Sequence, residues 1–182
     1  NVANLPPRAN CSIQAAIDAA NRDDLILLDP GIYKENVILY KRVRLQGAGA
    51  KSTVIQAGPL TPEEQVAWDA KVAALEAAGL LGLVDGERAD FYLERGAGIM
   101  VAPAEGEFLS SGTRPRIDGL TITGALKGGG IFVNAFARRL QISNTRLYAN
   151  QGSFGGGKIG STPSRESVST AAFAASLNRA LL

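Results

Sequence analysis

Arg114, Arg116 and Asp118 lie within one short segment and are the best candidates for a functional site in this sequence. Such residues could remove a proton or stabilise a developing negative charge. Histidine is absent, which excludes His-based triads, imidazole general bases and His-ligated metal sites. Any chemistry must therefore use carboxylates, arginine, lysine, tyrosine or serine. The alternative interpretation is that the three side chains only solvate a turn before a strand.

The composition and the charge distribution narrow the class of protein. The chain has 182 residues, of which 46% are hydrophobic and 20% charged, and this excludes disordered and transmembrane classes. Residues 61–94 carry a net charge of −6, whereas residues 108–182 carry +7. The basic part could attract an acidic polysaccharide, or it could be an ordinary solvated surface. A nucleic-acid partner is not expected, because the basic residues are not interleaved with aromatic ones.

The elements that must position these residues are one short helix and a series of short strands. The helix has apolar residues spaced along one face, with Asn10 or Ser12 as its cap: Ile13, Ala16, Ile17 and Ala20. The apolar segments that follow are too closely spaced for crossover helices, which excludes an ordinary βαβ arrangement: residues 25–28, 37–39, 43–45 and 53–55. An antiparallel sandwich and a parallel solenoid remain as alternatives.

A repeat of 25 residues favours the solenoid. Residues 117–123 match residues 142–148 position by position, with apolar residues at the first and sixth places. Gly119 and Asn144 share the third place, and glycine and asparagine most readily accept a left-handed backbone. A period of this length, built of very short strands, is typical of a solenoid that bends at this place.

Residues 25–55 and 117–160 resemble the right-handed parallel β-helix domains of the pectin-lyase-like superfamily. The helix followed by Pro-Gly-Ile-Tyr-Lys-Glu at residues 30–35 looks like the N-terminal cap and first coil of such domains. The resemblance implies an all-β solenoid, a right-handed single-stranded parallel β-helix with an N-terminal capping helix. That helix would cover strand edges that otherwise invite pairing.

We expect one β-helix domain over residues 1–182, interrupted by a helical insertion. The expected parts are a capping helix at 10–22, first coils at 23–58, the insertion at 59–96, further coils at 97–160, and a tail or helix at 161–182. This leaves four to five coils, so the chain is either a short β-helix or a fragment of a longer protein. Its start at Asn1, without Met, fits a processed secretory protein or an excised domain.

The insertion contains a helix signal of its own. Thr61-Pro62-Glu63-Glu64 is a capping box with proline at the first helical position, so it predicts a helix over residues 62–78. We expect one apolar stripe to pack on the coil: Val66, Ala70, Ala73 and Ala77, widened by Trp68, Val72 and Leu75. The insertion is either a lid beside a groove or a packed decoration.

The resemblance also implies polysaccharide chemistry, by hydrolysis or by β-elimination. Hydrolysis needs two carboxylates across the scissile bond, but Asp23 and Asp24 are adjacent and Asp118 is isolated. For β-elimination, the resemblance allows Arg114 or Arg116 as the base and calcium as the cation, held by Asp118. One carboxylate is a poor ligand set for an ion that takes six to eight oxygens.

We therefore expect a secreted or cell-surface module that presents a face for polysaccharide, in particular acidic polysaccharide, without a complete catalytic site. The expected substrate-binding residues are Arg116, Lys127 and Arg138. No cofactor and no membrane span are expected, and the sequence leaves the oligomeric state open. Two alternatives remain: a calcium-assisted polysaccharide lyase, with Arg114 or Arg116 as catalytic residue and Asp118 at the metal, and a structural or adhesive repeat segment of a large surface protein.

Overall fold

The computed structural model describes residues 2–6, 11–82, 96–109, 112–133 and 136–152. These residues form two helices and twelve strands, and every pairing between the strands is parallel. The antiparallel sandwich is thereby excluded. No helix in the described ranges is long and apolar enough to cross a membrane. The predicted tail at 161–182 lies outside the described residues.

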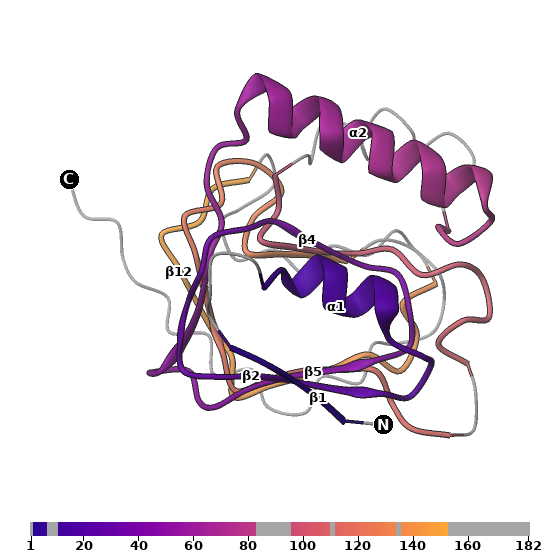
Figure 1. Ribbon diagram of the computed structural model, residues 1–182, viewed down its shortest axis with the longest axis horizontal. Coiled ribbons are helices and arrows are strands. Elements are labelled where there is room, and N and C mark those ends of the chain that lie inside the picture. Colours follow the sequence, from indigo (N-terminus) through magenta and orange to yellow (C-terminus); the bar gives the residue numbers. More distant parts are fainter. Residues whose placement is uncertain (1, 7–10, 83–95, 110–111, 134–135, 153–182) are drawn as a thin grey trace.

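The strands form three sheets that the chain visits in turn (Figure 1). Sheet A contains β1 (Val2–Leu5), β2 (Leu25–Leu28), β5 (Arg44–Gly47), β8 (Arg116–Asp118) and β11 (Gln141–Ser143). Sheet B contains β3 (Gly31–Tyr33), β6 (Thr53–Gln56), β9 (Thr121–Thr123) and β12 (Arg146–Tyr148). Sheet C contains β4 (Val37–Leu39), β7 (Ile99–Val101) and β10 (Ile131–Val133). From β2 to β12 the order is A, B, C, repeated, so the fold is solenoid-like and compatible with a parallel β-helix.

The predicted 25-residue repeat corresponds to neighbouring rungs of this stack. Ile117 of β8 lies opposite Ile142 of β11, and Ile122 of β9 lies opposite Leu147 of β12. The backbone at Gly119 has φ of 66°, and that at Asn144 has φ of 47°. Both residues are therefore left-handed at the bend between sheets A and B, which confirms the predicted bend.

Helix α1 (Ile13–Ala19) lies at the N-terminal end of the stack, and Ser12 caps it. Ile13 and Ile17 are fully buried in the core. In Figure 1, α1 lies within the outline of the coil, between β4 and the strands of sheet A. The predicted apolar face of this helix thus covers the core at one end of the stack.

Helix α2 (Pro62–Ala77) lies outside the coil on the side of β4 (Figure 1). Thr61 and Glu64 form the predicted capping box. The predicted packing stripe is wrong in part: Trp68, Val72 and Leu75 are buried, whereas the other four residues are exposed: Val66, Ala70, Ala73 and Ala77. The two sets are offset by two residues, or about 200° around a helix, and so lie on opposite faces. The larger side chains face the coil because they remove more apolar area from water.

Candidate functional site

The strongest sequence candidates, Arg116 and Asp118, lie on β8 in sheet A. Ile117 between them is fully buried, so their side chains lie on the outer face. Arg116 pairs in register with Arg44 of β5. Asp118 pairs in register with Gln46 of β5. With β11 these pairs form two columns across the sheet: Arg44, Arg116 and Gln141 in one, and Gln46, Asp118 and Ser143 in the other. We call these six residues the sheet A ladder.

The polar groups of the sheet A ladder connect three successive strands. Nη2 of Arg116 donates to Oε1 of Gln46 at 2.6 Å and lies 3.7 Å from Oδ2 of Asp118. Oδ1 of Asp118 accepts hydrogen bonds from Oγ of Ser143 at 2.8 Å and from Nδ2 of Asn144 at 2.9 Å. Asp118 thus serves as the common acceptor between the rungs of β8 and β11. Within the described ranges, no three acidic, cysteine or histidine side chains gather as metal ligands around it or elsewhere.

Two arginines of the ladder have an unmet hydrogen-bond donor. Nε of Arg44 and Nε of Arg116 are buried and have no hydrogen-bond partner among the described residues. The backbones of the two arginines are neighbours in register, about 4.8 Å apart, and Nη2 of Arg44 donates to the carbonyl of Asp23 at 3.3 Å. A negatively charged ligand on this face would be attracted by both guanidinium groups.

The remaining predicted residues lie at other places around the coil. Arg114 is exposed and precedes β8. Lys127 is exposed in the connection from β9 to β10, and Arg138 is half-buried in the connection from β10 to β11. The structure therefore brings Arg116 next to Asp118, whereas Lys127 and Arg138 lie on two different connections.

A cleft of about 670 Å³ lies between the two helices. A groove beside the insertion was one alternative in the sequence, but no residue of this cleft was predicted as a binding residue. Its walls come from four separate segments: residues 12–18, residues 34–38, residues 56–60, and residues 64–71 of α2. No motif joins these segments in the sequence, so the cleft exists only because the coil and the insertion bring them together.

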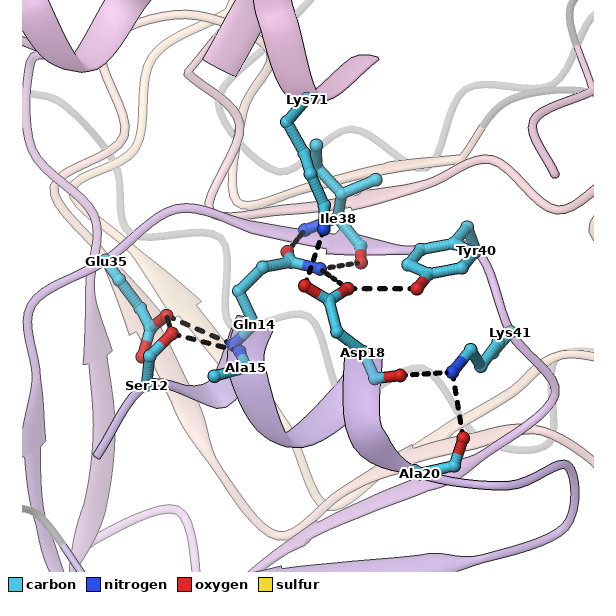
Figure 2. A network of polar contacts seen from close by, with 10 residues as sticks. All are labelled: Ser12, Gln14, Ala15, Asp18, Ala20, Glu35, Ile38, Tyr40, Lys41 and Lys71. Atoms are coloured by element: carbon cyan, nitrogen blue, oxygen red, sulfur yellow. Dashed lines mark hydrogen bonds and ion pairs between the residues drawn. The ribbon is translucent and has the colours of Figure 1, made fainter. Parts of the chain in front are cut away.

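Asp18 connects the two helices beside this cleft (Figure 2). Its Oδ2 lies 2.5 Å from Nζ of Lys71 on α2, and its Oδ1 accepts from Tyr40 at 2.9 Å and from Gln14 at 3.1 Å. Burial raises the pKa of Asp18, but the hydrogen bonds from Lys71, Gln14 and Tyr40 outweigh it, so the pKa is lowered overall. Burial and the Asp18 carboxylate raise the pKa of Tyr40. Asp18 is thus held ionised against Lys71.

Glu35 and Gln14 fix α1 to the coil on the other side of the network (Figure 2). Glu35 accepts hydrogen bonds from the backbone nitrogen of Ile13 at 2.7 Å and from Oγ of Ser12 at 2.9 Å. The side-chain amide of Gln14 donates to the carbonyl of Ile38 at 3.2 Å and accepts from its nitrogen at 2.7 Å. Because β4 is an edge strand of sheet C, Gln14 satisfies backbone groups that would otherwise be unpaired.

The lowered pKa of Asp18 predicts a pH-dependent contribution to stability. A carboxylate whose pKa is lowered on folding stabilises the fold above its unfolded value of 3.8, and this contribution is lost as the pH falls through the folded value. Asp18→Asn is therefore expected to lower the free energy of unfolding by about 1 kcal/mol at pH 7, and by less at pH 2.5. Urea unfolding at both pH values measures this. An equal difference at both would contradict the ion pair as the cause.

The structure thus offers two surfaces: the charged sheet A ladder, and the cleft between α1 and α2. The ladder can bind an anion through its arginines, whereas the cleft can enclose a small ligand. The predicted residues account for part of the first surface and for none of the second. Comparisons with protein-family models, with curated proteins and with solved structures find no match for this chain.

Proposed function

We propose that this chain is a secreted or cell-surface module with a right-handed, pectin-lyase-like parallel β-helix. Its role is to bind an acidic polysaccharide on the sheet A ladder without cleaving it. The cyclic order of the three parallel sheets supports the proposed β-helix. The in-register pair of Arg44 and Arg116 carries the proposed binding function.

The geometry of the ladder suits a linear anionic polymer. A chain that runs across the strands meets one arginine on β5 and the next on β8, about 4.8 Å further along. Gln46 and Gln141 lie in the same two columns and offer neutral hydrogen-bonding groups beside the cations. Hydrogen bonds of guanidinium to carboxylate are charge-assisted and therefore stronger than neutral ones. Uronate carboxylates repeated along a polysaccharide match this pattern of charge.

Removing either ladder arginine is expected to weaken the binding of polygalacturonate. Arg44→Gln and Arg116→Gln should each raise the dissociation constant about five- to tenfold at low salt, because one charge-assisted contact is lost. Affinity of the original protein should fall as salt is added, because exposed charges are screened. Isothermal titration calorimetry at two salt concentrations measures both effects. Lys51→Gln is the matched control, since it removes an exposed charge outside the ladder.

Three results would contradict this proposal. Equal, salt-independent affinity for neutral glycans would remove the role of the arginines. Calcium-dependent release of unsaturated uronates, seen as ultraviolet absorbance and lost in Arg116→Ala, would show a polysaccharide lyase instead. Absence of any glycan binding would favour a structural or adhesive segment.

A further inference from the structure

We propose that the cleft between α1 and α2, continued by a strip on sheet B, binds an uncharged oligosaccharide. The strip consists of Gln56, Thr123 and Tyr148, which are register partners on three neighbouring strands. This second site lies apart from the sheet A ladder and does not depend on the function proposed for it. The size of the cleft, the state of its charges and the exposed end of the strip support it.

The size and walls of the cleft suit a small ligand with both apolar and polar faces. Its volume of about 670 Å³ falls within the roughly 300–1,000 Å³ typical of small-molecule sites. Leu60 on the insertion is half-buried at this cleft, and the buried side chains of Trp68 on α2 and Ile38 on β4 lie behind its surface. Amide side chains of Asn36 and Gln56 lie among them. A pyranose ring combines an apolar C–H face with hydroxyl groups and so matches this mixture.

The acidic side chains of the cleft are already engaged within the protein. Glu35 accepts hydrogen bonds at the N-terminus of α1, and Glu64 accepts one from the backbone of Thr61 at the N-terminus of α2. Asp18 is paired with Lys71. Lys34 is exposed at the end of β3. With its carboxylates committed, the cleft has no carboxylate set aside for a cation, and the same carboxylates disfavour an anion.

The neutral polar groups, in contrast, retain hydrogen-bonding capacity. Nδ2 of Asn36 donates to the carbonyls of Gly96 and Ala97, and Oδ1 of Asn36 is an acceptor that this pair of bonds does not use. Gln56 is exposed at the end of β6, and its side chain has no hydrogen-bond partner among the residues that the structure describes. Hydroxyl groups of an uncharged ligand can both donate to and accept from these amides.

The strip extends the cleft along sheet B. Gln56 belongs to the cleft wall, Thr123 lies beside it on β9, and Tyr148 lies beside Thr123 on β12. Two strand spacings separate Gln56 from Tyr148, or about 10 Å. Tyr148 is 40% exposed, and the guanidinium of Arg146 lies 4.7 Å from its ring centroid. The exposed part of this ring can contact a sugar ring.

The sequence contains a single tryptophan, and Trp68 lines the cleft, so its fluorescence reports occupancy there. Three sugar series are titrated, each as a trisaccharide and as a hexasaccharide: malto-oligosaccharides, cello-oligosaccharides and xylo-oligosaccharides. We expect at least one series to change the Trp68 emission saturably. Gln56→Ala should raise the dissociation constant at least fivefold for both chain lengths. Tyr148→Ala should raise it at least threefold for the hexasaccharide, which is long enough to occupy the cleft and reach that ring as well.

Arg116→Gln serves as the control that separates this site from the ladder, and it should leave the titration unchanged. Weaker binding in Arg116→Gln would assign the signal to sheet A and overturn the second site. Absence of a saturable change with all three sugar series would overturn it as well, as would a Gln56→Ala protein with native circular dichroism and undiminished affinity. In Arg116→Gln, a saturable change in Trp68 emission at a lower concentration of trigalacturonate than of every neutral trisaccharide would refute the uncharged class of ligand.

Discussion

Gly119→Ala is expected to lower the free energy of unfolding by about 3 kcal/mol. Gly119 has a left-handed backbone with φ of 66°, which costs an alanine about 1 kcal/mol. A Cβ atom at this position would also lie only 2.8 Å from the backbone oxygen of Gly47 in the preceding rung. Because that oxygen belongs to the backbone of a neighbouring strand, relieving the contact must shift a rung, at a further cost of about 2 kcal/mol.

Gly79→Ala provides a matched control for this prediction. Gly79 has almost the same backbone angle, with φ of 67°, but nothing lies within 4 Å of the Cβ position. Only the conformational cost of about 1 kcal/mol should therefore appear. Urea unfolding followed by far-ultraviolet circular dichroism measures both variants. Equal losses in the two proteins would show that close contact between the rungs at Gly47 and Gly119 does not limit the fold.

Gln14→Ala is expected to lower the free energy of unfolding by about 2 kcal/mol. Its side chain is the hydrogen-bond partner of both backbone groups of Ile38, and Ile38 is only 1% exposed. Truncation leaves a buried donor and a buried acceptor without that partner, and each unmet group costs about 1 kcal/mol or more. Hydrogen exchange at the Ile38 amide should accelerate at least tenfold.

Gln65→Ala on α2 separates this effect from ordinary helix chemistry. Gln65 donates to Asp69 four residues later at 3.1 Å, as Gln14 does to Asp18 at the same distance. Such pairs within a helix contribute only about 0.5 kcal/mol or less, and only Gln14 also bonds a strand edge. A loss in Gln65→Ala as large as in Gln14→Ala would refute the role of Gln14 at sheet C.

The parts of this fold that could be predicted are those whose signal is periodic or local. Ile117 and Ile142 stack on one another, so the sequence must repeat at the period of one rung. The capping box at Thr61 and Glu64 involves residues three positions apart, and its hydrogen bonds depend on the local backbone alone. The bend at Gly119 was predictable for the same reason, since its counterpart occupies the same place in the repeat.

The parts that could not be predicted depend on contacts between distant segments. On α2 two apolar stripes lie on opposite faces, and only packing against the coil decides which one is buried. In the sequence, Gln14 is only a polar residue of a short helix. Its role as a hydrogen-bond partner of β4 depends on Ile38, 24 residues later. The candidate site divides in the same way. The pair of Arg116 and Asp118 is visible within β8. The alignment of Arg116 with Arg44 exists only in the assembled stack, and so does the cleft between the helices.

The insertion that carries α2 does not interrupt sheet C. β4 pairs directly with β7, with Val37 opposite Ile99, although residues 57–98 separate β6 from β7 in the sequence, whereas only residues 34–36 separate β3 from β4 one rung earlier. The entropy of closing a loop grows only with the logarithm of its length, so this longer corner costs only about 2 kcal/mol more. A corner of the coil can therefore accept a new segment while the strands on either side keep their register. In this fold, a binding surface can be gained at a corner by insertion, without a change in the core that supports it.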